Sequence, residues 1–408
     1  MTPQSFSYGT LGKNKKIYLP PYGLKESIDH MLVLDPGTFK IEKISIEVDS
    51  SFEKWITTVV VENKIYVLPY NESSILVIDT DNNVTKNIKI NVDGNGKYVC
   101  AHLYNNKIYA LPYGDGCIFD YVLILDTLTD TVQTIKLQLP INNEKKWHTT
   151  QMIDGIIYGM PRGELFDPCF PYRIEFNCDT LDCKLEDLSH LWEDIDQEGY
   201  SSAKYTTMAK YKDKLFSPPY CRNSNFDLMA IYENGIWGYV NTGQKSTSRK
   251  YYSHIVASNG KIYFPPAGHD EDWSEIIIVN GETGQLLIKE LGIGKESKKY
   301  FAGCENSQGK IYYIPRGGCV CEPEESWKSF GDLAEILVID INDDEGFYTI
   351  DVSEHYQDST TIEKYNNCVI IDDKIFALPY GETNSFQDIL VFDTITEQVI
   401  KKINLNDI

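Results

Sequence analysis

The chain has 408 residues, with 60 acidic against 38 basic side chains and a formal net charge of −22 at pH 7. This balance argues against a general nucleic-acid or anionic-membrane surface, since both need basic patches. No stretch reaches the roughly 18 apolar residues of a membrane helix, and the segment from Met1 to Phe6 has no signal-peptide core. We therefore expect a cytoplasmic (intracellular) protein that binds neither nucleic acid nor membrane; its oligomeric state stays open, with a monomer favoured.

One short unit recurs eight times along the chain. It reads Lys-Ile-Tyr or a close variant, and a Pro stands three residues after the aromatic residue. A unit repeated at a period of roughly 43–64 residues indicates a repeat architecture. The copies begin at Lys16, Lys64, Lys107, Ile156, Lys214, Lys261, Lys310 and Lys374.

Two further elements accompany this unit. An apolar run that closes on Asp or Asn follows it, as in Leu76-Val77-Ile78-Asp79, and a shorter, alternating strand comes after a turn. A Lys-aromatic pair lies ten or eleven residues ahead of it in seven copies: Lys54-Trp55, Lys97-Tyr98, Lys146-Trp147, Lys204-Tyr205, Lys250-Tyr251, Lys299-Tyr300 and Lys364-Tyr365.

Each repeat thus predicts four short antiparallel strands, which we name a, b, c and d in chain order. Strand a starts at the Lys-aromatic pair, strand b is the Lys-Ile-Tyr unit, and Pro ends it because Pro donates no ladder hydrogen bond. Four such strands per repeat predict one all-β domain over 1–408, an eight-bladed β-propeller, with a seven-bladed propeller as the alternative. The expected blades are 4–47, 54–92, 97–139, 146–190, 204–240, 250–291, 299–352 and 364–406.

The repeat resembles two known propeller families. Strand a followed by a turn and Lys-Ile-Tyr is similar to the Kelch repeat, and Ile75-Leu76-Val77-Ile78-Asp79-Thr80 resembles the YVTN (YncE)-type repeat. The resemblance covers nearly the whole chain and implies the propeller fold, on which many functions are found.

Strand a begins and strand b ends at the same end of a blade, so the Lys-aromatic pairs and the Pro-Tyr-Gly turns should meet there, beside the b–c loops. We predict that this end binds the ligand or partner, because binding residues are usually carried by loops on a rigid scaffold. The candidate residues are Lys54, Lys97, Lys146, Lys204, Lys250, Lys299 and Lys364, with Tyr113, Tyr220 and Tyr380 of the turns.

Two interpretations of the seven lysines stay open. They form an anion site at the mouth of the central channel, or they are structural and pair with acids such as Asp227, Glu275, Glu335 and Asp388 or lie on aromatic rings. Residues that break the repeat are sharper site candidates. Arg162 and Arg316 replace the turn Tyr in two blades, and Trp327 lies in the longest b–c loop.

The sequence contains no catalytic motif, so enzymatic activity stays undecided and a non-enzyme is favoured. Cys100, Cys304 and Cys368 fall at similar places in strand a and are expected to be small core residues. The close pairs Cys178/Cys183 and Cys319/Cys321 lack zinc spacing, so we expect no metal or cofactor.

Two hypotheses of function follow. The first is a non-enzymatic scaffold whose b–c loop end binds a protein partner with a basic surface, since a charge of −22 favours steering of cations. The alternative is an enzyme or a small-anion or carbohydrate-binding protein with its site at the channel mouth, held by Arg162, Arg316 and the strand-a lysines.

Overall fold

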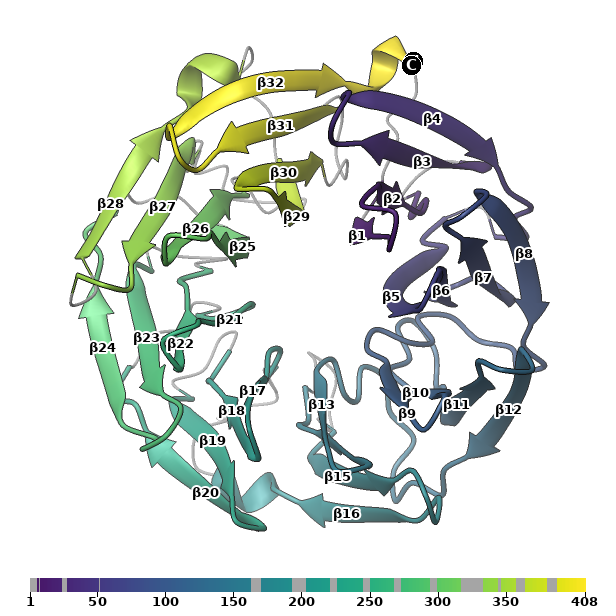
Figure 1. Cartoon of the computed structure of the whole chain (residues 1–408). Coiled ribbons are helices and arrows are strands. Elements are labelled where there is room, and N and C mark those ends of the chain that lie inside the picture. The colour runs from purple at the N-terminus through teal and green to yellow at the C-terminus, as the bar shows by residue number, and fades with distance from the viewer. Residues whose placement is uncertain are drawn as a thin grey trace, which may run out of the picture. The chain divides into compact units, whose positions relative to one another are not determined.

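The fold is an eight-bladed β-propeller of four-stranded antiparallel blades, as the repeat predicted (Figure 1). The computed structural model describes residues 6, 8–23, 28–50, 52–162, 170–192, 203–220, 226–244, 250–267, 273–293, 299–316, 333–343, 346–356, 364–379 and 387–408. In every blade the four strands are consecutive in the chain and hydrogen-bond in the order a-b-c-d. No described blade therefore combines strands from the two ends of the chain.

The blades form two compact units. Residues Thr10–Lys245 make one unit, which holds blades one to five, and Met1–Gly9 with Ser246–Ile408 make the other, which holds blades six to eight. The prediction of a single domain over 1–408 stays a prediction.

The strands of the five-blade unit follow the repeat. Blade one contains β1 (Thr10–Leu11), β2 (Ile17–Leu19), β3 (His30–Asp35) and β4 (Lys40–Ser45). Blade two contains β5 (Trp55–Val61), β6 (Lys64–Pro69), β7 (Ser74–Asp79) and β8 (Val84–Lys89). Blade three contains β9 (His102–Tyr104), β10 (Lys107–Ala110), β11 (Tyr121–Asp126) and β12 (Thr131–Lys136). Blade four contains β13 (Thr150–Ile153), β14 (Ile156–Gly159), β15 (Tyr172–Asn177) and β16 (Cys183–Asp187). Blade five contains β17 (Ala209–Tyr211), β18 (Lys214–Ser217), β19 (Leu228–Glu233) and β20 (Ile236–Asn241).

The three-blade unit has the same plan. Blade six contains β21 (Ile255–Val256), β22 (Lys261–Phe264), β23 (Glu275–Asn280) and β24 (Leu286–Glu290). Blade seven contains β25 (Tyr300–Glu305), β26 (Lys310–Pro315), β27 (Glu335–Asp340) and β28 (Gly346–Asp351). Blade eight contains β29 (Tyr365–Ile371), β30 (Lys374–Pro379), β31 (Asp388–Asp393) and β32 (Gln398–Asn404).

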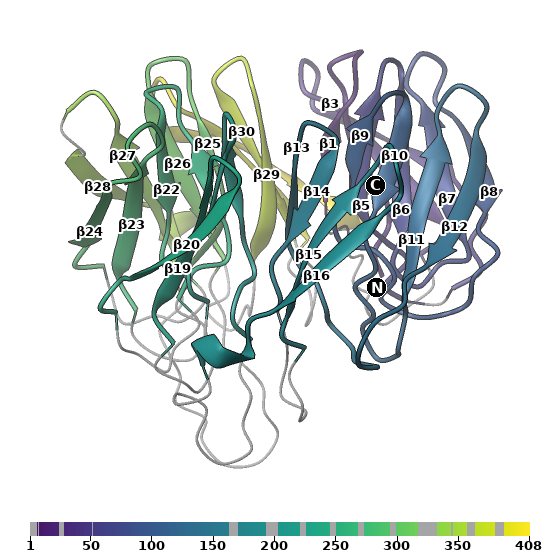
Figure 2. The same ribbon diagram turned by 90° about the horizontal axis from the view of Figure 1, so that it is seen from below.

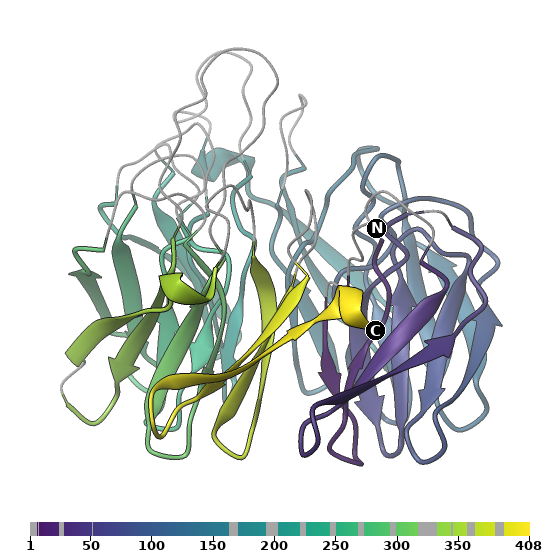
Figure 3. The same cartoon turned by 90° about the horizontal axis from the view of Figure 1, so that it is seen from above.

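The helices of the described ranges are three short 3₁₀ turns. They are η1 (Ser189–Leu191) after β16, η2 (Ser353–His355) after β28 and η3 (Leu405–Asp407), which follows β32 at the C-terminus (Figures 2 and 3). None of them is long and apolar enough to cross a membrane.

The core of each unit lies between neighbouring blades. Strands b and c are buried on both faces, as in β6 and β7, whereas strand d alternates between exposed and half-buried residues, as in β12. One apolar cluster, for example, joins Tyr66 and Val77 of blade two to Ile108 and Leu123 of blade three. Burial on both faces explains why the strand-c segments read as continuous Val, Ile and Leu runs.

The Tyr of the Lys-Ile-Tyr unit links its blade to the c–d turn of the next one. Tyr66 Oη donates to the Thr127 carbonyl at 3.2 Å and to Asp130 Oδ1 at 2.8 Å. Tyr312 does the same in the other unit, to the Thr394 carbonyl at 3.0 Å and Glu397 Oε1 at 3.2 Å. We call this repeated contact the tyrosine latch. It explains why a buried strand carries Tyr, since a buried phenol needs a hydrogen-bond partner.

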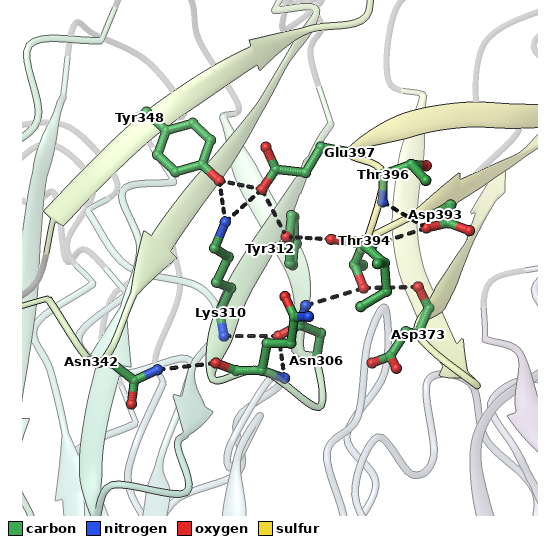
Figure 4. A network of polar contacts seen from close by, with 12 residues as sticks. Asn306, Lys310, Tyr312, Asn342, Tyr348, Asp373, Asp393, Thr394, Thr396 and Glu397 are labelled. Carbon is green, nitrogen blue, oxygen red and sulfur yellow. Dashed lines mark hydrogen bonds and ion pairs between the residues drawn. The ribbon is translucent and has the colours of Figure 1, made fainter.

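The latch of blades seven and eight extends into a polar network (Figure 4). Lys310 Nζ lies 2.8 Å from Glu397 Oε1 and 2.9 Å from Tyr348 Oη, which also donates to Glu397. Partial burial alone would raise the pKa of Glu397, but the hydrogen bonds from Lys310 and Tyr348 lower it. The network therefore holds an ionised carboxylate between the two blades.

The acid that closes strand c shapes the c–d turn. Asp126 Oδ1 accepts the backbone N–H groups of Leu128 and Thr129, each at 3.0 Å. Asp393 Oδ1 accepts those of Ile395 and Thr396, each at 2.9 Å. These backbone hydrogen bonds, led by the one from the Thr residue, lower the pKa of both carboxyls.

These lowered pKa values predict an acid-sensitive fold. A carboxyl with a lower pKa in the folded state stabilises the fold above its unfolded pKa, and this stability is lost as pH falls through the folded pKa. The free energy of unfolding should therefore decrease from about pH 5 downwards. Urea unfolding at several pH values measures this. The double variant Asp126→Asn/Asp393→Asn should show a shallower decrease, since Asn177 and Asn280 already form this turn in blades four and six. An identical pH dependence in the variant would contradict the assignment.

Candidate functional site

The candidate site is the end of the blades at which strand a begins and strand b ends, and we call it the loop end. The structure confirms that these two places meet. The backbone N–H of Tyr113 donates to the Lys97 carbonyl at 2.9 Å, and Tyr220 N–H donates to the Lys204 carbonyl at 2.8 Å. The loop end thus carries the strand-a lysines, the turn position after each Pro and the b–c segments.

The strand-a lysines also tie each blade to the preceding one. The N–H of Lys97 donates to the carbonyl of Tyr70 in blade two at 2.9 Å, and the N–H of Lys146 to that of Tyr113 in blade three at 3.1 Å. In the three-blade unit, Lys364 N–H reaches the Arg316 carbonyl at 2.6 Å. The lysine position therefore joins two turns through its backbone, one in its own blade and one in the blade before.

All seven lysine side chains are buried. Lys97 is 2% exposed and Lys54, Lys146, Lys204, Lys250, Lys299 and Lys364 are 0% exposed. Three of the ammonium groups donate to the carbonyl that leads into strand c of the preceding blade. These acceptors are Glu72, 3.0 Å from Lys97 Nζ, Phe119, 3.1 Å from Lys146 Nζ, and Leu333, 3.2 Å from Lys364 Nζ.

Within the described ranges, further lysine contacts include aromatic rings and a carboxylate. Lys204 Nζ lies 5.5 Å from the Trp192 ring centre and 5.3 Å from that of Phe226, and Lys250 Nζ lies 5.8 Å from that of Trp273. Lys146 Nζ forms an ion pair with Asp120 Oδ1 at 3.1 Å. Contacts of these two kinds, with aromatic rings and with acids, are what the structural interpretation of the lysines predicts. Asp388 is one of the acids that this interpretation names as lysine partners. Its Oδ2 lies 2.9 Å from Nζ of Lys402, which is not a strand-a lysine.

Burial lowers the pKa of Lys97 to about 8. Below that pH the fold holds a desolvated ammonium group, and between about pH 8 and 10 the unfolded chain binds the proton more tightly than the folded chain. The free energy of unfolding should therefore gain a positive contribution from Lys97 as pH rises through this range. Comparing urea unfolding of the wild type and Lys97→Met at pH 7.5 and 9.5 measures it. We expect the gain to be smaller in the variant, and an equal gain would contradict a buried, charged Lys97.

The turn tyrosines are also part of the blade contacts. Tyr70 Oη donates to Asp115 Oδ2 at 2.5 Å, and Asp115 pairs with Lys145 at 3.3 Å. Tyr113 is 2% exposed and Tyr220 is 3% exposed. Tyr380 and Trp327, the other two aromatic candidates, lie outside the described residues.

The two arginines that replace the turn Tyr lie on aromatic rings. The Arg162 guanidinium is half-buried, lies 5.6 Å from the centre of the Tyr113 ring and donates to the Tyr113 hydroxyl. Arg316 is 6% exposed, lies 4.1 Å from the centre of the Phe301 ring and donates to Asn366 Oδ1 at 3.0 Å. Each arginine thus fills a blade contact, and the structure places Arg162 nearer to solvent.

The inner strands of blades three to five carry a polar row, of which the sequence marks His148 as a single-blade residue but gives no signal for His102. His102 Nε2 lies 2.7 Å from Thr150 Oγ1, and His148 Nδ1 donates to the Thr206 carbonyl at 3.0 Å. Burial lowers the pKa of His102 to about 4, so this imidazole is neutral at pH 7. Within the described part of the chain, no group of three or more His, Cys, Asp or Glu residues could hold a metal ion.

Comparison with known proteins supports the propeller class. No protein-family model matches the chain, and no curated protein matches it in sequence. The structure of apo AztD from Citrobacter koseri aligns over 92% of this chain and 92% of its own, with 10% identity and a TM-score of 0.55.

A second similar structure is the dihydro-heme d1 dehydrogenase NirN in complex with DHE. It aligns over 98% of this chain and 78% of its own, with 9% identity and a TM-score of 0.58. At sequence identities of 9–10% the similarity to these two structures shows the fold alone and does not indicate a function.

Proposed function

We propose that this protein is a non-enzymatic scaffold whose loop end binds a macromolecular partner with a basic surface. The observation that carries the proposal is the burial of all seven strand-a lysines in contacts within and between blades. The repeated residues of the loop end thus serve the fold, which leaves recognition to the b–c segments that differ from blade to blade. We propose further that the repeat is of the Kelch-like or YVTN (YncE) type.

The charge of the b–c segments supports a basic partner. Asp270, Glu271 and Asp272 stand between β22 and β23, and Glu322, Glu324 and Glu325 stand between β26 and β27. Acidic segments on a chain of net charge −22 attract a basic surface and raise the association rate at low salt. Arg162 and Arg316 are proposed as contact residues where the b–c segments of blades four and seven begin.

Affinity capture from a lysate, quantified by mass spectrometry at two salt concentrations, tests the proposal. The test variant is Asp270→Asn/Glu271→Gln/Asp272→Asn. The matched control, Glu62→Gln/Asp154→Asn/Asp213→Asn, removes as much charge from the exposed a–b turns at the opposite end of blades two, four and five. We expect a salt-sensitive partner whose capture falls several-fold in the test variant and stays unchanged in the control.

Equal capture by all three proteins would contradict the loop end as the binding surface. An empty wild-type lane at both salt concentrations would contradict the scaffold and favour the alternative, a small anion or carbohydrate bound at the channel mouth. Arg162→Ala/Arg316→Ala, checked first for its melting temperature, tests the two arginines in the same experiment.

A further inference from the structure

A pair of cysteines lies between blades seven and eight, in the three-blade unit. Cys304 belongs to β25 and Cys368 to β29, the first strands of the two blades, and both are free thiols of intermediate exposure. Both side chains pack against the same apolar cluster between the two blades. Neither contributes to the loop end or to the tyrosine latch.

The strand register shows why the two thiols face one another. Cys304 stands opposite Tyr312, and directly opposed residues of an antiparallel pair point to the same face of the sheet. Tyr312 reaches into blade eight through its hydroxyl, so Cys304 points toward blade eight. Cys368 stands opposite Ala377, which packs in the apolar cluster shared by the two blades. Cys368 therefore points toward blade seven.

We propose that Cys304 and Cys368 are a redox-active dithiol that forms a disulfide between blades seven and eight when the protein meets a hydroperoxide. One thiolate attacks a peroxide oxygen, the O–O bond breaks, and a sulfenic acid forms as water or an alcohol leaves. The second thiol attacks the sulfenic sulfur, the S–S bond forms, and a second water leaves. Two thiols are oxidised by two electrons, and one hydroperoxide is reduced.

The environment of the pair sets the conditions of this reaction. The hydrogen bond to Cys368 and burial raise the pKa of Cys304, which keeps the thiolate fraction low at pH 7. Oxidation should therefore be slow at pH 7 and faster at pH 9. The neighbouring thiol then traps the sulfenic acid before it is oxidised further, because the two side chains face one another across the contact between the blades.

Peptide mapping of the full chain tests the proposal directly. Wild type is treated with hydrogen peroxide, remaining thiols are blocked with N-ethylmaleimide, and the protein is digested without reduction. We expect a peptide that joins Cys304 to Cys368 as the main disulfide of the strand-a cysteines. Cys100 is the matched control, since it also lies near the start of its blade but its Sγ contacts the His148 carbonyl at 3.3 Å rather than a thiol. It should be recovered as the maleimide adduct or an oxidised acid.

Thermal unfolding gives a second readout that does not depend on a variant. The cross-link would close a loop of about 65 residues, so the oxidised wild type should melt several degrees above the reduced protein. Cys304→Ser and Cys368→Ser should lose both the cross-linked peptide and this shift. Recovery of Cys304 and Cys368 as separate maleimide adducts, or as sulfinic acids without a cross-link, would overturn the proposal.

Discussion

Replacing Lys146 by Met should destabilise the five-blade unit by about 3–5 kcal/mol, since one partner of a buried ion pair is lost. Lys146 is 0% exposed, and its ammonium group forms an ion pair with Asp120 Oδ1 and donates a hydrogen bond to the Phe119 carbonyl. Met keeps most of the apolar stem but leaves a carboxylate, itself 7% exposed, without its cation. Urea unfolding followed by circular dichroism measures the loss.

A double-mutant cycle separates the ion pair from the packing. Lys146→Met/Asp120→Asn removes both charges and should recover part of the loss, so that the double variant is more stable than Lys146→Met alone. If Lys146→Met unfolds at the wild-type urea concentration, Lys146 does not hold blades three and four together.

Replacing Tyr312 by Ala should cost about 3–5 kcal/mol, the usual range for deleting a fully buried aromatic ring. Tyr312 is 0% exposed and packs among the apolar residues between blades seven and eight. Tyr312→Phe keeps the ring and removes only the hydroxyl, which donates to the Thr394 carbonyl and Glu397. That variant should cost about 1–3 kcal/mol, since it leaves buried acceptors without a donor.

The chain offers an internal comparison for this latch. Phe216 and Phe376 stand at the same repeat position in blades five and eight, the last blade of each unit. The position thus accepts a ring without a hydroxyl, so Tyr312→Phe is expected to fold. Equal stability of Tyr312→Phe and wild type would show that the latch contributes packing alone.

The repeat made the fold predictable from the sequence. Lys-Ile-Tyr, the Pro three residues later and the apolar run closing on Asp mark strand b, its end and strand c in nearly every blade, and the structure has these strands. After strand d of blade four the sequence also predicts one or two helical turns with Ser189 as the N-cap. The structure has the turn η1, but its N-cap is Leu188, which makes no side-chain cap hydrogen bond. Asp187 instead accepts the Ser189 N–H at 2.9 Å.

The role of the lysines could not be decided from the sequence. A lysine that binds an anion and one that donates to a neighbouring blade have the same local pattern, because the acceptors here are backbone carbonyls of Glu72, Phe119 and Leu333. Every residue has a backbone carbonyl, so an acceptor of this kind cannot be recognised from the residue type. The tyrosine latch, in contrast, had a signal, since a Tyr repeated in a strand buried on both faces requires a partner.

The sequence also did not predict that the two cysteines face one another, because this depends on the strand register. Cys304 follows its strand-a lysine by five residues and Cys368 follows its own by four. In a strand this difference of one residue places the two side chains on opposite faces of their blades, so that they face one another across the contact. The sequence showed only two cysteines at similar positions.

Lysine footprinting of the native protein tests the central claim most directly, namely that the seven strand-a lysines hold the blades and are not exposed at the loop end. The protein is reductively methylated for increasing times, and the modified lysines are quantified by mass spectrometry. We predict that Lys54, Lys97, Lys146, Lys204, Lys250, Lys299 and Lys364 stay unmodified until the chain is unfolded, while the exposed Lys13, Lys89 and Lys107 react at once. Modification of the strand-a lysines at the rate of these exposed ones would contradict the account and restore an accessible anion site.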